Sequence, residues 1–312
     1  MRIYIFLLLI LSGFSVRAQQ EKDSDVVVRE RPEEQSVPPR IYLLRGLSRE
    51  HGHWSDEFLN ELRDQFPGVS ITFMDLPGAG EYNDRKAFMS VKKMANFLHE
   101  THRDSLMQYR GNNILLATSL GGIVALEWLD RYPDDFDGAI MAASGFKGIC
   151  KGNERVRPKA KFASLSVLLT GNMPKREAKL LRINSNYYQG DSTILNRWID
   201  IQEKRPIKRM AMVKQGLGGL FYKPKKKKVS VPLLLLGSEG DRLVHPNCMC
   251  DVQNWFKATL KMHPSAGHGI PIDAPAWIVN ETADWWEEQL DLRAEGAEKK
   301  AVEQGKTDDT VN

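Results

Sequence analysis

The sequence predicts an α/β fold in which a mostly parallel sheet is covered by helices on both faces. Between residues 40 and 292, short apolar runs alternate with segments of helical periodicity. Such alternation is typical of strand–helix–strand units in a three-layer arrangement. The composition agrees, because 42% of the 312 residues are hydrophobic and 27% are charged, close to the averages of globular proteins. A formal net charge of +4 is too balanced for the whole chain to be a nucleic-acid binder.

Six apolar runs are candidates for the strands of this sheet, which predicts about six strands. They cover residues 41–44, 69–74, 113–117, 138–143, 231–236 and 259–262. Between and after them, apolar residues recur three and four positions apart, which indicates amphipathic helices. These helical segments cover residues 58–66, 88–109, 122–132 and 276–290.

A segment of different character, residues 146–228, interrupts the alternation between the fourth and fifth predicted strands. It contains 21 Lys and Arg residues but only 5 Asp and Glu residues. It has helix-like stretches at 175–186 and 193–204 and no clear strand, so we expect a basic helical insertion in a core of residues 40–145 and 229–292. A solvated face is the simplest explanation of its charge. Attraction of an anionic substrate, or contact with an anionic surface, is the alternative.

The two ends of the chain differ from the core. Residues 1–18 resemble a secretory signal peptide, with Arg2 before an apolar run and a cleavage site after Ala18. The run is shorter than the ~20 apolar residues of a spanning helix, which argues against the alternative of an uncleaved anchor. We therefore expect a secreted or periplasmic protein. Residues 19–39 are expected to be a leader or linker, and the polar residues 293–312 a disordered tail.

The three cysteines are Cys150, Cys248 and Cys250. In an oxidising compartment, Cys150 could form a disulfide bond with either of the other two. The sequence offers no further Cys or His ligands at zinc spacing, so a metal site at the Cys-Met-Cys motif is not expected.

Three residues at predicted strand ends indicate nucleophilic catalysis. Ser119 lies between a strand and a helix, with the small residues Ala117 and Gly121 two positions before and after it. Such a turn holds a serine hydroxyl at a helix N-terminus. Asp241 follows the next-to-last strand, and His268, flanked by glycines, follows the last one. A serine needs a base, and the base needs an orienting carboxylate, so these residues form a candidate catalytic triad.

Together with two further motifs, these residues resemble the α/β-hydrolase superfamily over about residues 40–290. Asp75 to Gly80 match its Asp-x-Pro-Gly-x-Gly motif, and Arg45, Gly46 and Leu47 stand where its oxyanion loop begins, with Trp54 at the family spacing. Arg45 replaces the usual His, and adds a positive charge near the pocket. The resemblance implies that Ser119 is the nucleophile, His268 the base and Asp241 the acid. It also implies that the backbone N–H groups of Leu47 and Leu120 hold the oxyanion. Arg45 and Trp54 are candidate substrate-binding residues.

The same resemblance implies a helical cap at residues 146–228. The chain departs from the family at its start, because almost no sequence is left for the first two strands of the full fold, and we therefore expect a reduced sheet. The function it implies is an exported serine hydrolase that cleaves carboxylic esters, thioesters or lactones of a small-molecule acyl substrate. No metal or organic cofactor is implied. Two alternatives stay open: an acyltransferase that uses the same triad, and a non-catalytic binding protein on the hydrolase fold.

Overall fold

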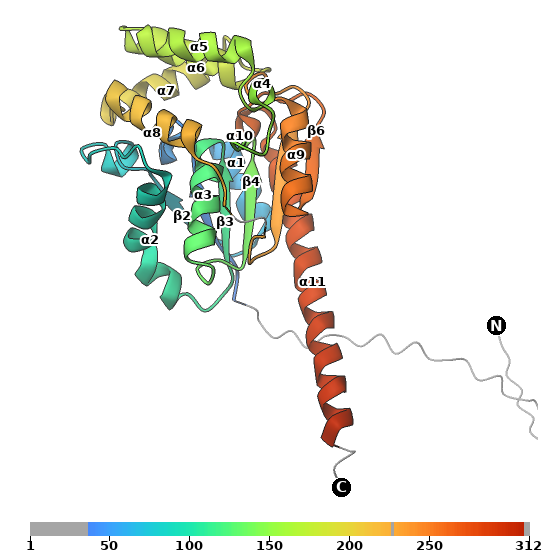
Figure 1. The fold of residues 1–312 in the computed structure, drawn as a ribbon. Coiled ribbons are helices and arrows are strands. Elements are labelled where there is room, and N and C mark those ends of the chain that lie inside the picture. Colours follow the sequence, from blue (N-terminus) through green and yellow to red (C-terminus); the bar gives the residue numbers. More distant parts are fainter. Residues whose placement is uncertain (1–36, 226–227, 309–312) are drawn as a thin grey trace, which may run out of the picture. The chain divides into compact units, whose positions relative to one another are not determined.

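The computed structural model describes residues 37–225 and 228–308 (Figure 1). The predicted signal peptide, its cleavage site after Ala18 and most of the predicted leader lie outside these residues. No helix of the described part is both long enough and apolar enough to cross a membrane.

One parallel sheet of six strands forms the centre of the described chain, in the order β2-β1-β3-β4-β5-β6. This confirms the predicted fold class and number of strands. The strands are β1 (Arg40–Leu44), β2 (Ser70–Met74), β3 (Asn113–Thr118), β4 (Gly138–Ala142), β5 (Leu233–Ser238) and β6 (Thr259–His263).

Alternate residues of the inner strands pack on opposite faces of the sheet, as strand geometry requires. On one face, Tyr42 and Leu115 join a cluster with residues of helices α2 (Val91–Gln108) and α3 (Leu120–Arg131). On the other face, Ile41 and Leu116 join a cluster with residues of helices α1 (Asp56–Gln65) and α11 (Pro275–Asp308). Burial on both faces explains why these strands are continuous apolar runs in the sequence.

The helices of the core are α1 (Asp56–Gln65), α2 (Val91–Gln108), α3 (Leu120–Arg131), α9 (Pro246–Phe256), α10 (Ile270–Asp273) and α11 (Pro275–Asp308). Two short 3-10 helices, η1 (His51–His53) and η2 (Gly80–Tyr82), lie in the loops after β1 and β2. Ser55 and Ser90 determine where α1 and α2 begin, because their side chains accept a hydrogen bond from the first turn.

The insertion between β4 and β5 is helical, as predicted, and its helices gather together at one end of the sheet (Figure 1). We call it the cap. Its helices are α4 (Gly152–Arg155), α5 (Pro158–Leu169), α6 (Met173–Asn184), α7 (Ser192–Lys204) and α8 (Arg209–Phe221).

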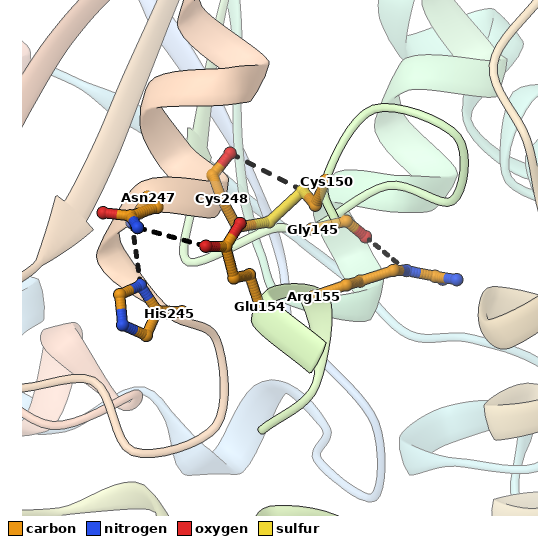
Figure 2. The surroundings of a disulfide bond; sticks show 7 residues. All are labelled: Gly145, Cys150, Glu154, Arg155, His245, Asn247 and Cys248. Carbon is orange, nitrogen blue, oxygen red and sulfur yellow. Dashed lines mark hydrogen bonds between the residues drawn. A yellow bond between two sulfur atoms is a disulfide. The ribbon is translucent and has the colours of Figure 1, made fainter. Parts of the chain in front are cut away.

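A disulfide bond joins Cys150, in the segment between β4 and α4, to Cys248 of α9 (Figure 2). Next to it, the Asn247 side chain donates a hydrogen bond to Glu154 of α4. Cys250 is an exposed free thiol. Of the two pairings that the sequence left open, the structure therefore has Cys150 with Cys248.

The C-terminal segment differs from the expectation. Helix α11 continues to Asp308, so the prediction of a disordered tail is wrong for residues 293–308, whereas residues 309–312 lie outside the described part. The segment is polar, but it is rich in Ala, Glu and Lys, which are strong helix formers. A polar segment cannot form an apolar core of its own, but it can still form a helix.

Candidate active site

Ser119 lies on a sharp turn between β3 and α3. Its φ of 55° and ψ of −118° are unusual for a residue with a side chain, and its N–H donates to the carbonyl oxygen of Ala142 at 2.8 Å. Close packing around the turn explains two small residues. A Cβ atom at Gly121 would lie 2.8 Å from two backbone oxygens, and one at Gly46 would lie 2.9 Å from the Cβ of Ser119. The geometry is that of a nucleophile elbow, which exposes the serine hydroxyl.

Ser119, His268 and Asp241 form a continuous line of hydrogen bonds. The Oγ atom of Ser119 is 2.9 Å from Nε2 of His268, and Nδ1 of His268 is 2.8 Å from Oδ2 of Asp241. The other carboxylate oxygen of Asp241 accepts from the N–H groups of Leu243 and Val244, at 2.7 and 3.0 Å. When Nδ1 donates to this fixed carboxylate, Nε2 remains free to accept the proton of Ser119.

The three residues follow β3, β5 and β6, at the carboxyl ends of parallel strands. Such ends lie at one edge of the sheet, which is why residues as far apart as 119 and 268 meet. The structure therefore brings together all three residues that the motifs predict for the triad.

The residues predicted to donate oxyanion hydrogen bonds lie beside this line. Leu120 is the first residue of α3, and N–H groups in the first turn of a helix have no partner within the helix. Leu47 lines the cavity and follows Gly46, where an added Cβ atom would lie only 2.9 Å from the Cβ of Ser119. Both backbone segments thus border the position that a carbonyl carbon attacked by Ser119 would occupy.

A cavity of about 390 Å³ lies between Ser119 and the cap. Ser119 and His268 line it from the sheet side, whereas α5, α6 and α8 cover it from the cap side. The cap residues are mostly apolar: Val167, Leu168, Leu180, Ile183, Met212, Val213, Leu217 and Leu220. The cap therefore supplies most of the wall that a bound molecule would contact.

The two predicted substrate-binding residues have different positions. Arg45 lines the cavity. Trp54 is only 1% exposed, stacks on Phe58 in the core and is not among the residues that line the cavity. The prediction that Trp54 binds substrate therefore does not agree with its position. The indole instead supports Arg45, whose guanidinium carbon lies 4.6 Å from the centre of a Trp54 ring.

Sequence reasoning missed a buried ion pair at the cavity. Nη1 of Arg49 lies 2.8 Å from Oε2 of Glu177 in α6, and both side chains are buried. Arg49 also lies over the ring of Trp198 in α7, at 3.9 Å. The spacing of Arg45 and Arg49 in one loop is visible in the sequence, but no local pattern links Arg49 to a residue 128 positions away.

Glu50, His51 and Asp75 place possible metal ligands within 4.8 Å of one another. Each carboxylate already has partners, since Arg205 donates to both oxygens of Glu50, and the N–H groups of His51 and Glu81 donate to Asp75. The hydrogen bond that the His51 ring donates to the Asp75 carboxylate raises the pKa of His51. We interpret this group as the anchor of the loop after β1, not as a metal centre.

Fold and site together define an α/β-hydrolase of the serine hydrolase type. Residues 38–274, about three quarters of the chain, match the family described as serine aminopeptidase, S33, and the chain belongs to this family. A search of curated proteins finds no matching relative.

Solved structures agree on the fold. An esterase from Thermogutta terrifontis is 18% identical with a TM-score of 0.60, and the match covers 81% of this chain and 91% of that protein. The esterase RhEst1 from Rhodococcus sp. ECU1013 is 15% identical with a TM-score of 0.61, over 80% and 90% of the two chains. The peroxisomal α/β-hydrolase Lpx1 from Saccharomyces cerevisiae is 14% identical with a TM-score of 0.59, over 81% and 77%. At these identities the likeness shows the fold alone.

Proposed function

We propose that the protein is an exported serine hydrolase that cleaves carboxylic esters, thioesters or lactones of small molecules. The observation that carries this proposal is the hydrogen-bonded line from Ser119 through His268 to Asp241 at the wall of a largely apolar cavity. The esterases among the structural neighbours are consistent with an ester substrate.

In the proposed reaction, Ser119 Oγ attacks the acyl carbonyl carbon while His268 Nε2 takes the hydroxyl proton. The N–H groups of Leu47 and Leu120 stabilise the oxyanion of the tetrahedral intermediate, and each is worth about 3 kcal/mol of the barrier. When the intermediate collapses, His268 returns the proton to the leaving alkoxide or thiolate. Water, activated by His268, then releases the acid from the acyl-enzyme, and no cofactor is needed for either step.

The first test is the intact mass of the protein after exposure to a fluorophosphonate, with the wild type beside Ser119→Ala. We expect one adduct on the wild type and none on the variant. Turnover of 4-nitrophenyl esters that survives Ser119→Ala would contradict the mechanism. A folded wild type that forms no adduct would favour the non-catalytic alternative.

An acyltransferase would use the same triad but give the acyl group to an alcohol or amine. Competition separates the two reactions: product ratios are measured with an alcohol acceptor added to the ester assay. The proposed hydrolase predicts that the free acid dominates. Transfer that exceeds hydrolysis at millimolar acceptor would favour the transferase.

Two observations support export. The first is the signal-like N-terminus, and the second is the Cys150–Cys248 bond, because disulfide bonds persist in oxidising compartments. We expect the mature chain to begin at Gln19. The mass of the protein recovered from a host that exports it tests this cut. An intact N-terminus in the cytoplasmic fraction would contradict it.

We also infer that the basic cap contacts anionic surfaces. Helix α5 exposes three apolar side chains on one stripe, Phe162, Leu165 and Leu169, within a segment rich in Lys and Arg. Apolar side chains beside basic ones suit an anionic interface. Co-sedimentation with phosphatidylglycerol vesicles should exceed that with phosphatidylcholine vesicles and fall with salt. Equal sedimentation with both lipids would contradict the inference.

A further inference from the structure

Two arginine residues line the cavity although both are almost completely buried. Arg45 is 5% exposed and Arg49 is 6% exposed, and both come from the loop after β1. The only other lining residue of the described chain with a permanent charge is Lys161, at the exposed edge of α5, and no lining residue among those described is acidic. The charge of the cavity wall is therefore entirely positive.

The two arginines differ in how their charge is balanced. Arg49 has a counter-charge, because Glu177 accepts a hydrogen bond from its Nη1 atom. Its Nη2 atom is nevertheless buried without a hydrogen-bond partner. The Nη1 atom of Arg49 is therefore paired with a carboxylate, whereas its Nη2 atom can still donate to a bound acceptor.

Arg45 has no counter-charge among the described residues. It stacks on Trp54, and its Nε atom is buried without a hydrogen-bond partner. Burial and the neighbouring charge of Arg49 lower the pKa of Arg45 to about 9, so that it is still a cation at neutral pH. Leaving a cation buried and unpaired is unfavourable, and a bound anion would remove this cost.

We propose that Arg45 and Arg49 form a carboxylate-binding subsite, and that the enzyme acts on esters that carry a carboxylate near the scissile bond. This inference rests on the proposed function. Arginine presents a planar fork of donors that matches a carboxylate. Arg45, Arg49 and Ser119 line the same cavity of about 390 Å³, so a carboxylate on this fork and an ester carbonyl at Ser119 can belong to one small molecule. The apolar cap residues then contact its hydrocarbon part.

The test compares substrate pairs that differ in one charge. Mono-4-nitrophenyl glutarate and 4-nitrophenyl valerate place the difference on the acyl side, and 4-carboxyphenyl acetate and phenyl acetate place it on the alcohol side. The quantity measured is the ratio of kcat/KM for the charged ester to that for the neutral ester. We expect a ratio above one for at least one pair in the wild type, and a loss of about 10- to 100-fold in Arg45→Gln.

Lys161→Gln is the matched control, because it removes one positive charge from the edge of the same cavity. We expect it to change the ratio less than about threefold, as for an exposed charge. A loss equal to that of Arg45→Gln would overturn the subsite, since general attraction by positive charge would then explain the preference. Arg45→Lys keeps the charge without the fork and should give an intermediate loss.

A binding measurement separates the subsite from the chemistry. Glutarate and the neutral glutaramide are titrated calorimetrically into Ser119→Ala, with and without Arg45→Gln. Glutarate should bind more tightly than glutaramide, and Arg45→Gln should abolish the difference. This comparison within Ser119→Ala also stands if Arg45→Gln fails to fold, because equal binding of the two compounds would overturn the subsite.

The two hypotheses fail in different ways. Hydrolysis of neutral esters that depends on Ser119, with a ratio unchanged in Arg45→Gln, would overturn the subsite and leave the hydrolase. Arg45-dependent glutarate binding without hydrolysis of any ester would overturn the hydrolase and leave the subsite.

Discussion

The sheet and the cap both border the cavity, but they are held in place by different interactions. Strands β1, β3, β4 and β5 contribute side chains with no exposed surface, such as Leu43, Leu116 and Leu235, to two large apolar clusters. Helices α5 to α8 of the cap contribute buried residues only to small apolar clusters, for example Leu181 and Trp198 with Ile272 of α10. Apolar burial is therefore the main stabilising term of the core, and much less of it is available to the cap.

Polar contacts attach the cap to the core. Arg205 of α7 forms a bidentate pair with the buried Glu50, and Glu177 pairs with Arg49. Arg157 donates to the carbonyl oxygen of Asp241, and Ser185 donates to Asp273. The triad therefore lies on the sheet, which has the larger apolar core. Most of the cavity wall belongs to the cap, which single polar substitutions can loosen. Substitutions in both parts test this separation.

Asp241→Asn should have the largest effect, and it should affect chemistry alone. An amide at this position donates to Nδ1 of His268, which places the proton on Nε2, and Nε2 then cannot accept from Ser119. We expect kcat to fall about 10⁴-fold with little change in melting temperature. Steady-state hydrolysis of a 4-nitrophenyl ester measures it. Glu239→Gln, exposed two residues earlier, is the control, and an Asp241→Asn enzyme of wild-type activity would refute the role of the acid.

Glu177→Gln should affect the attachment of the cap. It leaves Arg49 buried without its counter-charge, which we expect to cost about 3 to 5 kcal/mol. If the cap can open while the core stays folded, amide hydrogen exchange should rise in α6 much more than in β4. Urea unfolding and hydrogen exchange measure the two effects. The control is Glu203→Gln on the exposed side of α7, and equal exchange in α6 and β4 would mean that cap and core unfold together.

Cys150→Ser should reduce stability by a smaller amount. The Cys150–Cys248 bond closes a loop of 98 residues that contains all the helices of the cap. Its loss increases the conformational entropy of the unfolded chain, and we expect about 2 to 4 kcal/mol. Thermal unfolding with and without a reductant measures the loss, and the reductant should not affect Cys150→Ser. Cys250→Ser removes the exposed free thiol and should melt like the wild type. An unchanged midpoint for Cys150→Ser would show that the disulfide bond does not stabilise the attachment of the cap.

The smallest effect is a pH dependence in the loop between core and cap. Burial and the charge of Arg49 hold the pKa of His53 well below 6.5. As the pH falls below 6.5, His53 is therefore protonated in the unfolded chain before it is protonated in the folded one. The free energy of unfolding then falls by up to about 1.4 kcal/mol per pH unit until the lowered pKa is reached. His53→Gln should remove this slope. Urea unfolding at pH 7.5, 6.5 and 5.5 measures it.

His51→Gln is the counterpart in the same loop. Its pKa is raised by the hydrogen bond to Asp75, so its contribution is present below pH 6.5 and is lost as the pH rises through the raised pKa. The two variants should therefore change the slope in opposite directions. Parallel profiles would show that His53 is not held neutral between cap and core.

The sequence predicts most of the core and the composition of the candidate triad. Continuous apolar runs mark β1, β3, β4 and β5, because a strand buried on both faces must be apolar throughout. The edge strands β2 and β6 are only partly buried, and polar residues interrupt their runs. Small residues mark the turn at Ser119, because only they let its backbone approach neighbouring strands. The predicted tail fails for residues 293–308, because polar composition does not distinguish an exposed helix from a disordered chain.

What the sequence by itself determined is local: which segments become strands and helices, and which residues stand at the ends of strands. Only the tertiary structure decided which distant side chains meet, such as Glu177 with Arg49, Cys248 with Cys150, and Trp54 with Arg45 instead of the cavity. The physical reason is that periodicity and turn chemistry act over a few neighbouring residues. Pairing and burial across the cavity depend instead on how the cap packs onto the finished sheet.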